Sequence, residues 1–160
     1  MTNDSDANGR MSVLLLSLLL AMSAFATVAV ATTGGSMSGD SGNGFMMNME
    51  SVTAPDNADG SYNQSQYIMA DLNTTGLQNG NDYSVHYGFI DGATGTMVHE
   101  NWDNWTQMDD SGYHVTYASY YPTNAGCYGF SADLMNEYTD TNGSTFMASD
   151  AWVHWGFAVD

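Results

Sequence analysis

The sequence almost lacks basic side chains. Its 160 residues hold one Lys or Arg against 18 Asp and Glu, which gives a formal net charge of −17 at pH 7. The one basic residue is Arg10, so residues 11–160 carry sixteen carboxylates and no Lys or Arg. Phosphate groups are bound mainly by these cations, so we expect no nucleic-acid partner and no phosphate-handling chemistry. An anionic membrane surface would repel such a chain, and we expect membrane contact only through residues 11–31.

The acidity has two interpretations. Unscreened negative charge opposes compaction, and about 1 M salt shortens the Debye length to about 3 Å. A chain with this composition therefore suits high salt, where its acidity keeps it soluble. The alternative is a chain that binds specific divalent cations.

Cysteine and catalytic motifs are equally scarce. Cys127 is the only cysteine, so an internal disulfide is impossible, and the spacing of a zinc site is absent. Its place in a strand-like run predicts a small buried residue, with an intermolecular disulfide as the alternative. The sequence has no nucleophile-elbow serine and no HExxH. We therefore expect a protein that is not an enzyme, and we assign no catalytic residue.

The N-terminal part contains the longest hydrophobic run. Residues 11–31 are uncharged and predict a hydrophobic helix, either a signal peptide ending at Ala29-Val30-Ala31 or a membrane anchor about 31 Å long. A pilin-like filament helix is a third alternative. The first two place the rest of the chain outside the cytoplasm, secreted or anchored at the cell surface. Residues 32–44 are rich in Gly and Ser and predict a flexible linker, and residues 45–160 form the predicted domain.

A short phrase occurs three times in that domain. Val85-His86-Tyr87-Gly88-Phe89 returns as Val153-His154-Trp155-Gly156-Phe157, and Cys127-Tyr128-Gly129-Phe130 is a third version. All three lie in runs rich in β-branched and aromatic residues, which is strand composition. We interpret them as the centre of one β-sandwich, with each Gly allowing an aromatic ring of a neighbouring strand to approach closely.

Other alternating runs predict further strands, at 45–49, 62–72, 96–102 and 113–121. Two of these alternate clearly, because Tyr67 and Met69 lie opposite Ile68 and Leu72. In the other, Tyr113, Val115, Tyr117 and Tyr121 share one side. Asn-Gly and Asp-Gly turns separate the runs. Together they predict an all-β protein: an antiparallel, immunoglobulin-like β-sandwich of about 7–8 strands.

One local motif supports this class. Asp110-Ser111-Gly112-Tyr113 resembles the turn and tyrosine that precede a late strand of immunoglobulin-like domains, although Val115 stands where that fold has its Cys. In its acidity, its hydrophobic segment and its N-x-S/T glycosylation sequons, the chain also resembles secreted archaeal-type surface proteins. The resemblance implies a cell-surface β-sandwich.

Several polar residues are candidates for modification or metal binding. His86 and His154 occupy the same place in two copies of the phrase and could bind a transition metal if their strands are neighbours. His86 and Met97 have a His-x10-Met spacing that suits copper, and residues 56–60 have the composition of a weak calcium loop. Four N-x-S/T sequons are candidate glycosylation sites: Asn63, Asn73, Asn104 and Asn142.

These features lead to one leading hypothesis and one alternative. The leading hypothesis is a non-catalytic, extracytoplasmic surface, adhesion or structural module adapted to high salt, with no cofactor. Trp102, Trp105 and Tyr120 would contact protein or glycan partners. Residues 32–49 could donate a strand in self-assembly. The alternative is a secreted module that binds calcium or copper.

Overall fold

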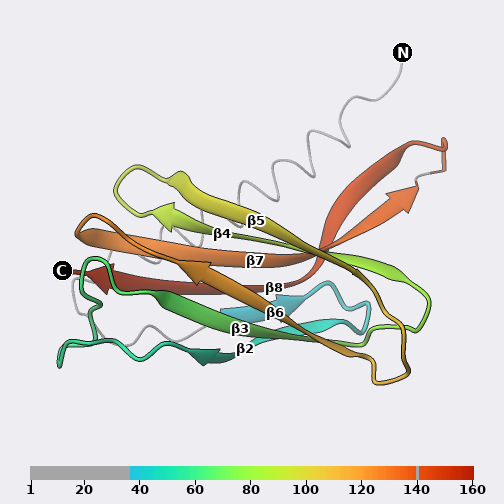
Figure 1. The fold of residues 1–160 in the computed structure, drawn as a ribbon. Coiled ribbons are helices and arrows are strands. Elements are labelled where there is room, and N and C mark those ends of the chain that lie inside the picture. The colour runs from blue at the N-terminus through green and yellow to red at the C-terminus, as the bar shows by residue number, and fades with distance from the viewer. Residues whose placement is uncertain (1–36, 140) are drawn as a thin grey trace, which may run out of the picture. The chain divides into compact units, whose positions relative to one another are not determined.

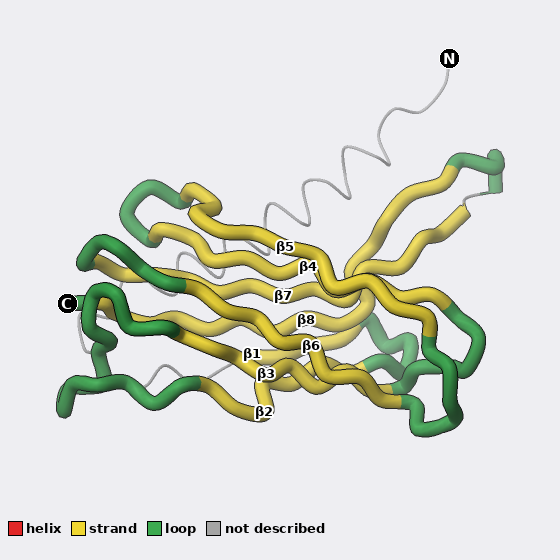
Figure 2. Tube along the Cα trace, viewed as in Figure 1, coloured by secondary structure: helices red, strands yellow, loops and turns green. Residues whose placement is uncertain are grey.

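The computed structural model describes residues 37–139 and 141–160, which form eight strands and no helix (Figure 2). The hydrophobic segment, its predicted helix and residues 32–36 lie outside this described part. The strands are β1 Met37–Asp40, β2 Met46–Val52, β3 Ile68–Thr75, β4 Asp82–Asp91, β5 Thr96–Thr106, β6 Tyr113–Tyr120, β7 Gly126–Thr139 and β8 Thr145–Val159.

The strands build two antiparallel sheets. The larger sheet has five strands in the order β1-β8-β7-β4-β5, and the smaller has three in the order β2-β3-β6. Figure 1 shows the two sheets as separate layers, and buried side chains of both layers form one hydrophobic cluster between them. The predicted all-β, antiparallel class and the predicted number of strands are therefore confirmed.

The three copies of the repeated phrase lie on neighbouring strands. They fall on β4, β7 and β8, which occupy the middle of the five-stranded sheet. Phe89 registers with Phe130, and Phe130 registers with Trp155, so the phrase forms one row of rings that faces the core. The ring centroids of Phe89 and Phe130 are 4.9 Å apart. The phrase therefore builds the core, as its composition predicts.

The glycine of the first phrase has a different close neighbour from the one predicted. A Cβ at Gly88 would lie 2.2 Å from the sulfur of Met97 on the adjacent strand β5. A methionine side chain therefore fills the space at this glycine, whereas we predicted an aromatic ring. A comparable aromatic contact occurs at Gly39, where a Cβ would lie 2.4 Å from the ring of Trp152.

Two stretches differ from their predicted conformation at the N-terminal side of the domain. Residues 37–40, assigned above to a flexible linker, form β1, which pairs Ser38 with Val153 on β8. The strand predicted from residue 62 begins only at Ile68, because Ser65 has a positive φ of 69° and turns the chain. Tyr62 instead bridges to Val159 and packs edge-to-face on Phe157. Residues 32–49, the suggested donor segment, thus include two strands that pair within their own chain.

Cys127 differs from its predicted burial. It lies near the start of β7 and is exposed. Its neighbour Tyr128 is buried, and successive residues of a strand point to opposite faces. The side chain of Cys127 therefore points away from the core.

The β7–β8 hairpin extends past the other strands of its sheet and bends away from them (Figure 1). A register shift between Leu134 and Met135 marks the start of the bend, as expected because a bulge increases local twist. Asp150 lies at this base and is 2% exposed. Its carboxylate accepts hydrogen bonds from four neutral side chains: Ser41 at 3.1 Å, Asn43 at 2.9 Å, Asn136 at 2.6 Å and the hydroxyl of Tyr138.

This arrangement keeps Asp150 ionised without a cationic partner. Burial by itself would raise the pKa of the carboxyl group, but the four hydrogen bonds outweigh it, and the pKa lies below its usual value of 3.8. The same contact has the opposite effect on its partner, because burial and the bond to Asp150 raise the pKa of Tyr138 to about 12. Hydrogen bonds from neutral groups therefore stabilise the charge that holds the hairpin to β1 and its loop.

We expect Phe89→Ala to lower the free energy of unfolding by about 3–5 kcal/mol, because Phe89 is fully buried among rings of both sheets. Val98→Ala is a control on the neighbouring strand β5, where the side chain is exposed, and it should change stability by about 0.5 kcal/mol or less. Urea unfolding at fixed salt measures both. Equal effects of the two substitutions would contradict the assignment of the core.

We expect Asp150→Asn to cost about 1–3 kcal/mol near neutral pH, because the amide leaves donors of a buried network unsatisfied. The folded pKa of Asp150 is depressed, so its stabilisation is complete above the unfolded pKa and is lost as the pH falls through the folded pKa. Urea unfolding at successively lower pH should therefore show the two proteins converging in acid. Asp110→Asn, at an exposed carboxyl group bonded to Asn79, is the control. A pH-independent difference would contradict the role of the charge.

Candidate functional site

The outer face of the three-stranded sheet is the most unusual surface of the described residues. In β3 the buried residues Ile68, Ala70, Leu72 and Thr74 alternate with residues that point outward. β6 follows the same pattern, with Thr116 and Ala118 inward and Tyr113 and Tyr117 outward. We call this surface the tyrosine face, and its large side chains are Tyr67, Tyr113, Tyr117, Tyr121, Met46 and Met69.

These side chains are open to solvent. Tyr117 is 66% exposed and Tyr121 51% exposed, and the other four lie between 42% and 54%. Tyr113, Tyr117 and Tyr121 follow one another at intervals of four residues along β6 and its continuation. At about 3.4 Å per residue, this spacing places successive rings about 14 Å apart. The face therefore presents a line of aromatic rings rather than a single ring.

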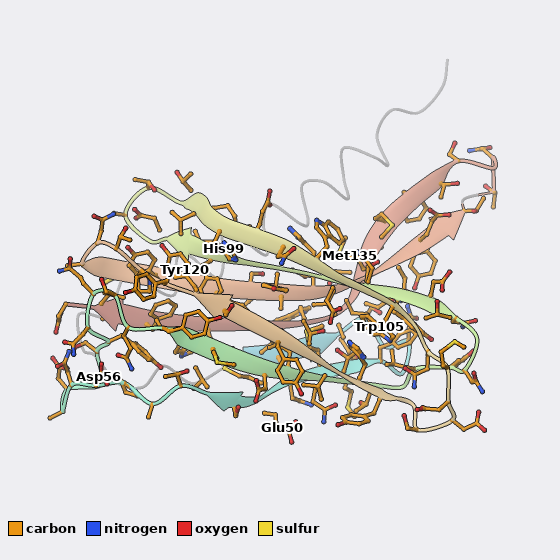
Figure 3. The ribbon with its side chains drawn as sticks, in the orientation of Figure 1. Glu50, Asp56, His99, Trp105, Tyr120 and Met135 are labelled. Atoms are coloured by element: carbon orange, nitrogen blue, oxygen red, sulfur yellow. The ribbon has the colours of Figure 1, made fainter. Side chains whose placement is uncertain are left out.

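The tyrosine face carries very little charge. Its residues in register across the three strands include one carboxylate, Asp71, which accepts a hydrogen bond of 2.6 Å from Ser51. Glu50 lies at the bulge of the edge strand β2, at the border of this face (Figure 3). The other polar residues of the face are neutral: Asn48, Asn73, Thr75 and Ser119. A chain with sixteen carboxylates in residues 11–160 thus keeps this surface nearly uncharged.

The aromatic residues that we predicted to contact partners occupy different positions. Trp102 is 45% exposed on the outer face of the larger sheet. Trp105 instead stacks on His114 of β6, with ring centroids 3.9 Å apart. Tyr120 stacks on Phe89 at 4.9 Å, inside the sandwich, and Figure 3 shows Tyr120 and Trp105 toward opposite ends of the layers. Of the three residues, only Trp102 is exposed, whereas Trp105 and Tyr120 are partly buried against the core.

His86 and His154 do not lie on neighbouring strands. β7 separates β4 from β8, and His86 registers with Asp133 whereas His154 registers with Ser131. Each imidazole stacks on its own tryptophan: His86 on Trp102 at 4.4 Å, and His154 on Trp152 at 4.7 Å. The structure thus places both histidines on the same side of the larger sheet, as alternation predicts, but does not bring them together.

The two imidazoles also differ in environment. His86 lies 3.4 Å from Glu100 and is partly exposed. Burial lowers the pKa of His154 below its usual 6.5, and the nearby Asp133 acts in the opposite direction. In residues 37–139 and 141–160, no three His, Cys, Asp or Glu side chains gather into a group that could hold a metal ion. The geometry therefore does not add ligands to either histidine.

Sequence reasoning missed a histidine between the sheets. His114 of β6 lies 2.9 Å from Asp103 of β5, and the same carboxylate oxygen accepts a hydrogen bond of 2.8 Å from Thr116. Trp105 stacks against this histidine. Because the hydroxyl of Thr116 donates to Asp103 and not to His114, the group is not arranged as an activated nucleophile. The contact between His114 and Asp103 joins an edge strand of each sheet. In the sequence, only the alternation of residues 113–121 indicated that His114 points inward.

The acidic loop at residues 56–60 is held by its own hydrogen bonds. Asp59 accepts bonds from the backbone and the hydroxyl of Ser61, and these bonds lower its pKa. The hydroxyl oxygen of Ser61 also lies 2.6 Å from a carboxylate oxygen of Asp160, so the two carboxylates share its one hydrogen, and Asn63 donates to Asp56 at 3.2 Å. The carboxylates therefore serve to shape the loop.

The four sequons lie in three kinds of environment. Asn142 is exposed in the turn of the β7–β8 hairpin, as predicted, and Asn63 is exposed in the loop before β3. Asn104 is exposed on the edge strand β5 and accepts a hydrogen bond from Ser84. Asn73 was predicted in a turn but lies in β3, paired on both sides, and its Oδ1 atom is buried without a hydrogen-bond partner.

Comparisons with known proteins add little. No family model matches the sequence, and no curated protein does. Among solved structures, a crystal structure of the CARDB domain of a Pyrococcus furiosus protein, in complex with di-metal ions, has a TM-score of 0.40 at 11% identity. It covers 84% of this chain and 95% of that chain. A solution structure of a CARDB domain from the same organism has a TM-score of 0.40 at 15% identity and covers 72% and 94%. Similarity at this level carries no argument about ligands.

Within the part of the chain that the structure describes, no helix is both long and apolar enough to cross a membrane.

We expect glycosylation of the exported protein, where it occurs, to favour Asn142 and to leave Asn73 unmodified, because an acceptor must be accessible at a turn or loop. Peptide mapping by mass spectrometry measures this directly. Asn142→Gln should remove the modified peptide, and Asn73→Gln should leave the intact mass of the glycan unchanged. A glycan on the Asn73 peptide would contradict the placement of this residue within β3.

Proposed function

We propose that the chain is a non-catalytic, extracytoplasmic β-sandwich module that contacts a surface partner through the tyrosine face. The observation that carries the proposal is the concentration of exposed aromatic and methionine side chains on a face with two carboxylates, Asp71 and, at the bulge of the edge strand, Glu50. Single exposed apolar residues are ordinary, whereas a contiguous group of them marks an interaction surface.

The composition of the tyrosine face supports this role. Tyrosine and methionine are enriched at protein interfaces, and Asp and Glu are depleted there. An acidic chain adapted to salt could place carboxylates at exposed strand positions without cost to its core. At Tyr67, Tyr113 and Tyr117 it has large rings instead, although these side chains add nothing to the buried cluster. Contact with a partner gives these rings a function.

The rest of the chain supports a surface location and a non-catalytic role. The hydrophobic residues 11–31 favour export or anchoring, as either a signal peptide or an anchor. The polar group nearest to a catalytic arrangement, His114 with Asp103, lies under Trp105 between the sheets. Calcium or copper binding stays a prediction. For a transition metal shared by His86 and His154, the structure is unfavourable because β7 separates their strands.

Binding of the purified full chain to washed cells of its own source tests the proposal. In the triple variant Tyr67→Ser, Tyr113→Ser, Tyr117→Ser, we expect the cell-bound fraction to fall by about tenfold or more, because aromatic contacts at the centre of an interface typically contribute over 1 kcal/mol each. All three residues are about half exposed or more, so the variant should melt close to the wild-type temperature.

The matched control places the same number of serines on other exposed apolar positions. Val98, Trp102 and Met147 are 42–45% exposed and lie on β5 and β8 of the larger sheet. This control should bind within about twofold of wild type. Unchanged binding of the tyrosine variant, or loss confined to the control, would overturn the assignment of the tyrosine face.

A further inference from the structure

We infer that the partner of the tyrosine face is an uncharged polysaccharide. This inference rests on the proposed function, since it takes the tyrosine face as the contact surface and identifies the chemistry of the molecule that covers it. Three properties of the face lead to it: its low charge, its shape and the presence of polar groups beside the rings.

Charge selects against ionic partners. An anion would meet sixteen carboxylates and no Lys or Arg in residues 11–160, and it would be repelled. A cation would be attracted to the acidic loops and turns, where Asp56, Asp59 and Asp110 lie, and not to the face with two carboxylates. An uncharged ligand is the class for which the tyrosine face offers an advantage over the remaining surface, because few hydrated carboxylates must be displaced there.

Shape selects for a polymer. Sites for small molecules are usually concave, whereas the tyrosine face is the open side of a sheet whose rings are about half exposed. Tyr113, Tyr117 and Tyr121 follow one strand at intervals of about 14 Å. An extended chain can contact several of these rings together, and their weak contacts then add through effective concentration. A single small ligand could contact only one or two of them.

Rings and polar groups lie side by side across the strands. Tyr117 registers with Asp71, which is bonded to Ser51, and the next outward pair is Val115 with Asn73, opposite Asn48 on β2. A sugar ring has an apolar C–H face and a rim of hydroxyl groups. The tyrosine rings can stack on the apolar face of the sugar. The amide, carboxylate and phenol groups can exchange hydrogen bonds with its hydroxyl groups. A second copy of this chain would supply no such rim and would bring a second large negative charge.

Affinity electrophoresis of the full chain in gels that contain a soluble polysaccharide tests the inference. The probes are neutral mannan, xylan and mixed-linkage glucan, anionic polygalacturonate and cationic chitosan. We expect at least one neutral polymer to retard the protein. The retardation should change little between low salt and about 1 M NaCl, because no ion pair is involved. Tyr117→Ala should weaken it by about tenfold, and Tyr117→Phe, which keeps the ring, by much less.

The possible outcomes separate this inference from the proposed function. Retardation by chitosan alone, abolished by salt, would overturn the inference and would indicate attraction by net charge. No retardation by the neutral polymers would also overturn it. If sedimentation then showed self-association that Tyr117→Ala removes, the tyrosine face would still be the contact surface and the partner would be a second copy. If Tyr117→Ala altered neither polysaccharide retardation nor cell binding, the proposed function would be overturned as well.

Discussion

The near absence of basic side chains constrains every charged group in this molecule. With no Lys or Arg in residues 11–160, a carboxylate that leaves water must be satisfied by neutral donors or by histidine. Asp150 shows the first solution, with four hydrogen bonds from Ser, Asn and Tyr side chains. Asp103 shows the second, between His114 and Thr116. Both carboxylates join separate strands, although Asp150 is buried and Asp103 is partly exposed. The fold thus uses hydrogen-bonded carboxylates to link its strands.

The same constraint affects the surface. Carboxylates without a Lys or Arg partner lie in turns and loops, as at Asp56, Asp59 and Asp110, and also along the strands of the larger sheet, as at Glu100 and Glu137, where water or salt can solvate them. The outer face of the small sheet is left with tyrosines, methionines and neutral polar residues. Because a partner that covers a carboxylate must displace its hydration water, this nearly neutral face is where an uncharged partner can make contact at the lowest desolvation cost.

The sequence predicted the strands well and their neighbours poorly. Alternation in the repeated phrase and in residues 113–121 correctly separated two sides of each strand, since side-chain period is a local property. It could not say which strands pair, so the separation of His86 from His154 by β7 appeared only in the structure. It also could not say which side of an edge strand meets the other sheet. For that reason Trp105 and Tyr120 were predicted as exposed, although each stacks on another ring. Tyr113, Tyr117 and Tyr121 form the open face instead.

Hydroxyl-radical footprinting of free and cell-bound protein tests whether the tyrosine face is the contact surface. Tyrosine, methionine and tryptophan side chains are all labelled in this method, and both sheets expose them. We expect protection of Tyr67, Met69 and Tyr117 in the bound state, with Trp102 and Met147 labelled as in the free protein. Protection of Trp102 and Met147 with unprotected tyrosines would contradict it and would move the contact surface to the larger sheet.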